Sequence, residues 1–232
     1  MGDTPKLIGM IGGMSWESSS LYYQLLNREV HRRLGRQHNA RSILFTLDFD
    51  ELDLAAGEGN WALIGQRVAD AARALERAGA DFIMITSVTG HAVFEKVQGA
   101  VGVQMLHIAD ALKNKLPAGA QVGLLGTRFT LTMPHLIGPL EKRLGVEVLV
   151  PPEQDREVLQ RIISNELQHG RVSSGSQILV REMAAALNAR GAEAVLLGCT
   201  ELPLLMAASD YPVRALDLVQ LHVEAAAERS LR

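Results

Sequence analysis

The sequence has 232 residues, of which 47% are apolar and 21% charged, so it allows one large globular domain or two small ones. A formal net charge of −3 gives no indication of nucleic-acid binding, and no stretch approaches the ~18 apolar residues that a membrane span needs. A single cysteine excludes an intrachain disulfide and a CxxC metal site, and the start MGDTPKLIGMIGG lacks the pattern of a signal peptide, so we expect a cytoplasmic protein.

Strand-like and helix-like patterns alternate along the chain. In the first part, strands are expected near 6–12, 42–48, 81–87 and 102–106. Helices are expected near 18–34, 59–78, 91–98 and 108–115. In the second part, strands are expected near 121–126, 147–150, 193–198 and 213–216. Such alternation predicts an α/β fold, with mostly parallel sheets flanked by helices.

Three pairs of segments recur in the same order and indicate an internal duplication. LIGMIGGM from Leu7 is similar to QVGLLGTR from Gln121. LERAGADFIMITSVTGH and LNARGAEAVLLGCTE form the second pair, and VQMLHIADAL and VRALDLVQLH form the third. We therefore expect two pseudo-symmetric α/β halves, residues 1–100 plus 210–232 and residues 101–209. Ligands collect at the carboxyl ends of parallel strands, so the active site is expected in the cleft between the halves.

The duplication makes Ser87 and Cys199 equivalent. Eight residues separate Gly79 from Ser87, and eight separate Gly191 from Cys199. Side chains presented from two halves to opposite sides of a ligand suit the removal of a proton from one face of a carbon and its return to the other. Both residues are therefore candidate catalytic groups.

Cys199 has the better chemistry for this task. A thiol has an unperturbed pKa of ~8.5 and can act as an acid or a base near neutrality. A helix opening through Thr200 and Glu201 would favour the thiolate. The alternative is a buried cysteine that packs as a small apolar side chain. Serine is much less acidic and needs an activating partner.

Two glycine-containing turns are candidates for binding a carboxylate. Gly13, Met14 and Ser15 precede an expected helix, and Thr127 occupies the matching turn of the second half. Neither turn has the GxGxxG or GxxxxGK[ST] signature of a nucleotide site. The alternative is a tight backbone turn without a ligand.

Other polar residues also have structural interpretations. His91 could orient a neighbouring group or could cap a helix, and His107 and Asp217 are interpreted as helix-entry groups. The acidic segment 48–53 is interpreted as a solvated loop in preference to a metal site. No metal site and no cofactor are expected.

The segments GMIGGMSWES, LLGTRFT and LLGCTELPLL resemble the aspartate/glutamate racemase family, and the similarity runs from about Leu7 to Leu216. The resemblance implies two pseudo-symmetric halves, no pyridoxal phosphate or metal, and a pair of cysteines acting on the substrate α-carbon. Cys199 matches the second of these cysteines. The turns above and the residues beside the two catalytic positions, Val88, Thr89, Gly90, Thr200 and Glu201, would then bind the substrate.

The chain departs from the family pattern at the first cysteine. The pattern Cys-Asn-Thr-x-His corresponds to Ser87-Val88-Thr89-Gly90-His91, so serine replaces cysteine and valine replaces asparagine. Three functions follow: an amino-acid racemase of unusual design, a single-cysteine decarboxylase or isomerase of the same superfamily, and a ligand-binding protein without turnover. A protein with any of these functions would bind a small carboxylate and neither nucleic acid nor a membrane. It could form a homodimer.

Overall fold

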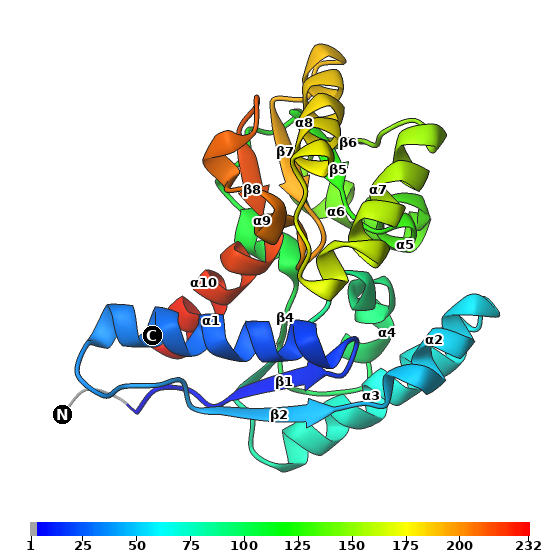
Figure 1. The fold of residues 1–232 in the computed structure, drawn as a ribbon. Coiled ribbons are helices and arrows are strands. Elements are labelled where there is room, and N and C mark those ends of the chain that lie inside the picture. The colour runs from blue at the N-terminus through cyan, green and yellow to red at the C-terminus, as the bar shows by residue number, and fades with distance from the viewer. Residues whose placement is uncertain (1–3) are drawn as a thin grey trace. The chain divides into compact units, whose positions relative to one another are not determined.

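The computed structural model describes residues 4–232, without the side chains at positions 134 and 135. The chain forms two units: the first contains the residues up to Ala111 together with His222–Arg232, and the second is Leu112–Leu221 (Figure 1). These divisions lie 11 and 12 residues beyond the expected boundaries at 100/101 and 209/210. Strand pairing accounts for the difference, because Met105 pairs with Ile83 in the first unit and Ala215 pairs with Val195 in the second.

The first unit is a parallel four-stranded sheet in the order β2-β1-β3-β4. Its strands are β1 (Ile8–Gly12), β2 (Ser42–Thr46), β3 (Phe82–Ile85) and β4 (Met105–Leu106). Its helices are α1 (Trp16–Leu34), α2 (Phe49–Gly57), α3 (Trp61–Arg77), α4 (Phe94–Gln98) and most of α10 (Leu218–Ser230). Figure 1 shows α1 and α3 on opposite faces of this sheet.

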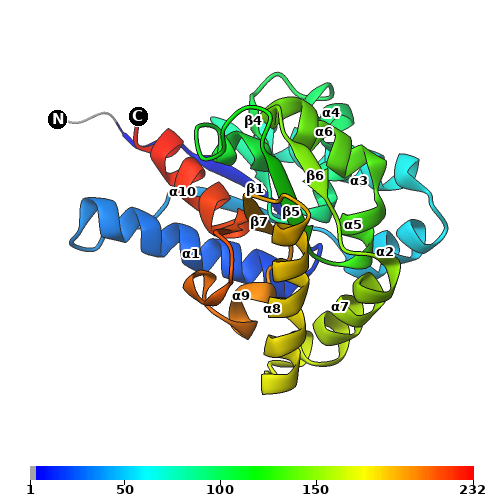
Figure 2. The ribbon, with the colours of Figure 1, turned by 90° about the horizontal axis from the view of Figure 1, so that it is seen from above.

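The second unit repeats this plan with the order β6-β5-β7-β8, again entirely parallel. Its strands are β5 (Gln121–Leu125), β6 (Glu147–Leu149), β7 (Ala194–Leu197) and β8 (Ala215–Asp217) (Figure 2). Its helices are α5 (Arg128–Thr132), α6 (Pro134–Leu144), α7 (Glu153–Asn165), α8 (Ser174–Ala189) and α9 (Leu202–Leu205). The predicted α/β fold of two duplicated halves is confirmed.

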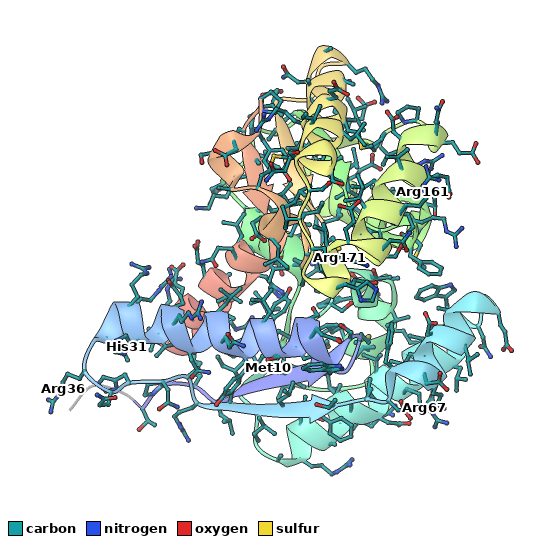
Figure 3. The ribbon with its side chains drawn as sticks, viewed as in Figure 1. Met10, His31, Arg36, Arg67, Arg161 and Arg171 are labelled. Carbon is teal, nitrogen blue, oxygen red and sulfur yellow. The ribbon has the colours of Figure 1, made fainter. Side chains whose placement is uncertain are left out.

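The alternation of side chains along β1 and β3 divides the apolar residues of the first unit between two faces. Ile11, Ile83 and Ile85 form a core cluster with side chains of α3 that include Val68 and Leu75. Met10 and Phe82, at the intervening positions, are also fully buried. Figure 3 shows Met10 on the face that α1 covers. Both faces of the sheet are therefore buried along β1 and β3, as is usual for parallel sheets.

Residues that are equivalent in the sequence repeat also have equivalent partners in the two sheets. Gly9 lies opposite Ile83, and Gly123 lies opposite Val195. A Cβ on Gly9 would lie 3.2 Å from the Cβ of Leu75, so glycine allows α3 to approach β1 closely. Gly123 stands in the same relation to Leu187 of α8, where the distance is also 3.2 Å.

The acidic segment after β2 is a helix, so the expectation of a loop was wrong. Asp48 is the N-cap of α2 and accepts a hydrogen bond from the N–H of Asp50 at 3.3 Å. Glu51 binds Arg67 of α3 with an oxygen–nitrogen distance of 2.6 Å, and Figure 3 labels Arg67 on that helix. Carboxylates in a first helical turn are favoured by the helix dipole, which explains their clustering here. Within residues 4–232, no helix is both long and apolar enough to cross a membrane.

Candidate active site

Ser87 follows the carboxyl end of β3 and is buried. Its Oγ accepts a hydrogen bond of 3.2 Å from the N–H of Gly90, at the start of the 3-10 turn Thr89–Val93. Val88, which directly precedes this turn, is also buried. A Cβ placed on Gly90 would lie 3.1 Å from the sulfur of Met14, so the fold brings the Met14 and Ser87 turns together.

The turn after β1 uses its polar groups internally. The N–H of Gly13 donates to Ser19 Oγ at 2.9 Å, and Ser15 Oγ accepts from the N–H of Ser18 at 3.4 Å as the N-cap of α1. Gly13 has φ +88°, and a side chain there would collide with the backbone of Leu47. The Met14–Ser15 peptide bond is cis. These contacts account for the glycine and serine residues of the turn. Carboxylate binding by Gly13, Met14 and Ser15 stays a prediction.

A buried hydroxyl network, which the sequence analysis missed, ties this turn to β3. Ser18 Oγ donates to the carbonyl oxygen of Thr86 at 2.9 Å. Ser19 Oγ lies 3.1 Å from Thr86 Oγ1, which in turn donates to the carbonyl oxygen of Ile11 at 3.0 Å. The run of serines at 18–20 is the only sequence signal for this network. The network holds the ends of β1 and β3 and the first turn of α1 in one arrangement.

His91 holds the backbone around Ser87. Its Nδ1 lies 2.7 Å from the carbonyl oxygen of Ser87, and its Nε2 accepts a hydrogen bond of 3.1 Å from the N–H of Ile108. Nε2 therefore has no proton, and Nδ1 is the nitrogen that donates. Both ring nitrogens contact the backbone, so His91 is a positioning residue rather than a base for the Ser87 hydroxyl.

His91 belongs to a buried aromatic cluster that no local pattern predicted. Its ring centroid lies 4.9 Å from that of His107 and 5.4 Å from that of His222. His222 Nε2 lies 3.1 Å from the carbonyl oxygen of Leu106, and its Nδ1 lies 3.3 Å from the hydroxyl of Tyr22. Burial, with a smaller effect of His91, lowers the pKa of His222 to about 3. The imidazole is therefore neutral across the physiological range.

The two other residues interpreted as helix-entry groups have that role. His107 Nδ1 accepts from the N–H of Ala109 at 2.9 Å. Asp217 Oδ1 accepts from the N–H groups of Val219 and Gln220 at 2.9 and 3.1 Å, at the start of α10. That interpretation is confirmed.

Cys199 follows the carboxyl end of β7, as Ser87 follows that of β3, and it is buried. Its Sγ lies 2.8 Å from Glu201 Oε2, and that oxygen also accepts from Thr200 Oγ1 at 2.6 Å. Burial raises the pKa of the Cys199 thiol well above its ordinary value, and the negative charge of Glu201 raises it further. The backbone N–H groups of Glu201 and Leu202, where the expected helix begins, do lower this pKa, but burial and the carboxylate outweigh them.

Thr127 lies at the carboxyl end of β5, the neighbour of β7. It is the N-cap of α5: its Oγ1 accepts from the N–H of Thr130 at 3.3 Å and lies 3.0 Å from Thr130 Oγ1. A Cβ on Gly198 would lie 3.1 Å from Thr130 Cγ2. The Thr127 turn and the Cys199 turn of the second unit are thus adjacent. Across residues 4–232, no group of three His, Cys, Asp or Glu side chains is placed to hold a metal ion.

These geometries define the class of protein. It is an α/β protein built from a duplicated parallel sheet, and equivalent strands end in a hydroxyl in one unit and in a carboxylate-bonded thiol in the other. In open parallel α/β sheets, ligands bind at the carboxyl ends of the strands, which is where both side chains lie.

Comparison with known proteins gives the family. The Asp/Glu/Hydantoin racemase family matches residues 11–226, so the chain belongs to this family. A crystal structure of a candidate Asp/Glu racemase from Yersinia pestis is 38% identical, with TM-score 0.90, and the match covers 98% of this chain and 100% of that one. An aspartate racemase homologue from Pyrococcus horikoshii OT3 is 35% identical, with TM-score 0.84 and the same coverage.

A curated relative is more distant. The broad-specificity amino-acid racemase RacX of Bacillus subtilis (strain 168) is 29% identical over 140 residues, which is 58% of this chain and 58% of that protein. Glutamate racemase from Francisella tularensis, solved with D-glutamate, shares the fold at 16% identity and TM-score 0.62.

Proposed function

We propose that this chain is an amino-acid racemase that works without a cofactor, with Cys199 as its main acid and base and Ser87 as the second group. One observation carries the proposal: the only thiol of the chain lies 2.8 Å from a carboxylate oxygen of Glu201, at a strand end. A cysteine that only packs as a small apolar side chain needs no carboxylate partner, so this contact supports a chemical role for the thiol.

The proposed reaction begins with the Cys199–Glu201 pair. The thiol transfers its proton to Glu201, which leaves a thiolate whose charge replaces that of the carboxylate. The thiolate then removes the substrate α-hydrogen as a proton. An S–H bond forms, the C–H bond breaks, and its electron pair moves into the substrate carboxylate as an enediolate. When the S–H proton exchanges with solvent before this step reverses, a solvent proton returns to the same face of the carbon and the configuration is unchanged.

Inversion requires a proton from the other face of the same carbon, and this is the role proposed for Ser87. Its O–H bond breaks, a C–H bond forms, and the electron pair stays on Oγ until water restores the proton. The N–H of Gly90, 3.2 Å from Oγ, stabilises the developing charge. A hydroxyl is a much weaker acid than a thiol, so exchange at the Cys199 face should be faster than inversion.

The names of the relatives support an amino acid as the substrate, and this chain's own residues suggest which kind. Val88 is apolar, and Leu54–Gly57 of α2 contains no polar side chain. We therefore propose a substrate that need not have a second carboxylate. Gly13, Met14 and Ser15, with Thr89, Gly90, Thr127 and Thr200, are proposed to surround it.

Deuterium exchange tests this function. Each of a panel of L- and D-amino acids is incubated with the enzyme in D₂O, and α-deuterium and enantiomer ratio are measured over time. The proposal predicts label at the α-carbon of at least one amino acid, followed by its enantiomer, without added pyridoxal phosphate. Exchange that stops on addition of iodoacetamide would tie it to Cys199, the only cysteine. Carbon dioxide release from malonates without α-exchange of any amino acid would contradict it.

A further inference from the structure

The backbone hydrogen bonds between β1 and β3 stop one bond before their register would allow. Ile11 lies opposite Ile85, and the carbonyl oxygen of Ile11 accepts from the N–H of Thr86 at 2.9 Å. In a parallel ladder the next bond would run from the N–H of Gly13 to the carbonyl oxygen of Thr86. Both of these groups bond to serine side chains of α1 instead.

Ser18 and Ser19 each take up one of the two backbone groups. The N–H of Gly13 donates to Ser19 Oγ at 2.9 Å. Ser18 Oγ donates to the carbonyl oxygen of Thr86, also at 2.9 Å. The two serines and Thr86 are buried, and a buried peptide group without a hydrogen bond would be costly. The serines thus satisfy the Gly13 turn and the Ser87 turn separately, so these turns need not pair with each other.

The arrangement does not recur in the described residues of the second unit. Positions 18 and 19 correspond in the sequence repeat to Thr132 and Met133. Thr132 Oγ1 donates to the carbonyl oxygen of Arg128 within its own helix at 2.9 Å, and methionine has no hydroxyl. The two serine bonds are therefore specific to the strand end that precedes Ser87.

Ser18 acts directly on the backbone of Ser87. The carbonyl group of Thr86 belongs to the peptide bond that precedes Ser87, so the bond from Ser18 Oγ fixes the orientation of that peptide group. His91 holds the following peptide group, since its Nδ1 lies 2.7 Å from the carbonyl oxygen of Ser87. The N–H of Gly90 holds Ser87 Oγ itself at 3.2 Å. Side-chain donors therefore hold both peptide groups that flank Ser87.

We infer that Ser18 is a positioning residue for Ser87, and this inference rests on the proposed role of the Ser87 hydroxyl in inversion. Reaction rates in enzymes depend steeply on the placement of the reacting groups, and a displacement of about 1 Å can cost about 10²-fold. The Cys199 thiol belongs to the other unit and does not depend on the bond from Ser18. Ser18 should therefore control protonation at the Ser87 face without controlling proton removal by Cys199.

Deuterium labelling of a Ser18→Ala variant tests this role. The substrate is the enantiomer whose α-proton the wild type exchanges faster, and the two products measured are labelled substrate of unchanged configuration and inverted product. Ser18→Ala should slow inversion by about 10–10²-fold and should change exchange by less than about twofold. Partial unfolding would lower both rates together, so their ratio separates positioning from stability. Ser18→Thr keeps a hydroxyl and should restore most of the wild-type ratio.

Ser20→Ala is the matched control. Ser20 lies on the same helix, and its Oγ accepts from Gln24 Nε2 at 3.3 Å on the exposed side. Its ratio of inversion to exchange should equal that of the wild type. A wild-type ratio in Ser18→Ala, or an equal fall in Ser20→Ala, would overturn the inference.

The double variant Ser18→Ala/Ser19→Ala provides the test if Ser18→Ala alone does not fold. With both hydroxyls removed, the N–H of Gly13 and the carbonyl oxygen of Thr86 can form the next bond of the ladder, so neither group stays unpaired. This variant should fold, and its inversion should slow as in Ser18→Ala because the Ser87 turn is drawn towards β1. A folded double variant with the wild-type ratio would contradict the inference.

Amide hydrogen exchange follows the position of Ser87 without any substrate. The N–H of Gly90 is bonded to Ser87 Oγ, so its protection, measured by NMR, reports on the placement of that oxygen. Protection of Gly90 should fall in Ser18→Ala and should stay at the wild-type level in Ser20→Ala. A wild type without α-exchange would contradict the proposed function, whereas unchanged protection of Gly90 in Ser18→Ala would overturn the positioning role by itself.

Discussion

The two units have one topology and two kinds of chemistry. Both sheets are parallel, and in each the first strand along the chain, β1 or β5, lies between the second and the third. Gly9 and Gly123 occupy equivalent places in these two strands. Yet the first unit places a hydroxyl after β3, backed by neutral histidines, and the second places a thiol bonded to a carboxylate after β7. Apolar periodicity and glycine set the topology, whereas two or three polar residues at the strand ends set the chemistry.

The largest expected effect follows from removing the thiol of the second unit. Cys199→Ala should reduce α-proton exchange by ~10²–10⁴-fold, the usual cost of losing a general acid or base. No other thiol can replace it. The measurement is the initial rate of deuterium incorporation, with circular dichroism as the check on folding. An exchange rate equal to that of the wild type in a folded Cys199→Ala protein would remove the basis of the proposed mechanism.

A thiol in both units should make the α-proton exchange rates of the two enantiomers more nearly equal. The wild type should exchange the α-proton of one enantiomer faster than that of the other, because only one face has a thiol. Ser87→Cys should raise the slower rate by up to ~10²-fold, since a thiol is the better acid and base. Rates are measured separately from L- and D-substrate. Ser87→Ala is the control, and it should abolish inversion while exchange at the Cys199 face persists. Equal rates for both enantiomers in all three proteins would show that Ser87 takes no part.

The histidine cluster makes the first unit sensitive to acid. The pKa of His222 is about 3 in the folded chain against an ordinary value of 6.5. The unfolded chain therefore binds the proton first as pH falls. The stability that depends on neutral His222 is complete above pH 6.5 and is lost progressively between pH 6.5 and 3.

This dependence can be measured as a slope. Between pH 6.5 and 3, one such group contributes about 1.4 kcal/mol of unfolding free energy per pH unit. His222→Gln should unfold more easily than the wild type at pH 8, because the bonds to Tyr22 and Leu106 are altered. Its stability should then fall less steeply on acidification. Parallel slopes for the two proteins would contradict a buried neutral His222.

Much of the fold could be predicted because its signals are local and repeated. Apolar runs of strand length, together with glycine after a helix, located the eight strands described within residues 4–232 to within a few residues. The helix α2 was missed although Asp48 and Glu51 have the spacing of a capping box, because the acidic segment was interpreted by its charge alone.

The site could be predicted in position but not in its contacts. The equal eight-residue spacings located Ser87 and Cys199 at equivalent strand ends. Side-chain rotamers decide that Glu201 turns back to the thiol and that His91 bonds to the backbone, and no spacing specifies a rotamer. His222 reaches His91 from a helix far along the chain, so no local pattern could pair them.

The smallest and most specific effect concerns the contact that distinguishes the second unit. Because the negative charge of Glu201 helps to raise the pKa of the Cys199 thiol, Glu201→Gln should lower that pKa towards its ordinary range. Iodoacetamide reacts with the thiolate, and Cys199 is the only cysteine, so the pH at which alkylation is half-maximal reports on this thiol alone. That midpoint should move to lower pH in Glu201→Gln and should not move in Glu182→Gln, an exposed acidic position on α8. Proton exchange should nevertheless slow in Glu201→Gln, because an amide cannot accept the thiol proton. A more acidic thiol in a slower enzyme would separate the role of Glu201 as a base from its effect on charge. A midpoint that stays in place would show that burial alone sets the pKa of Cys199.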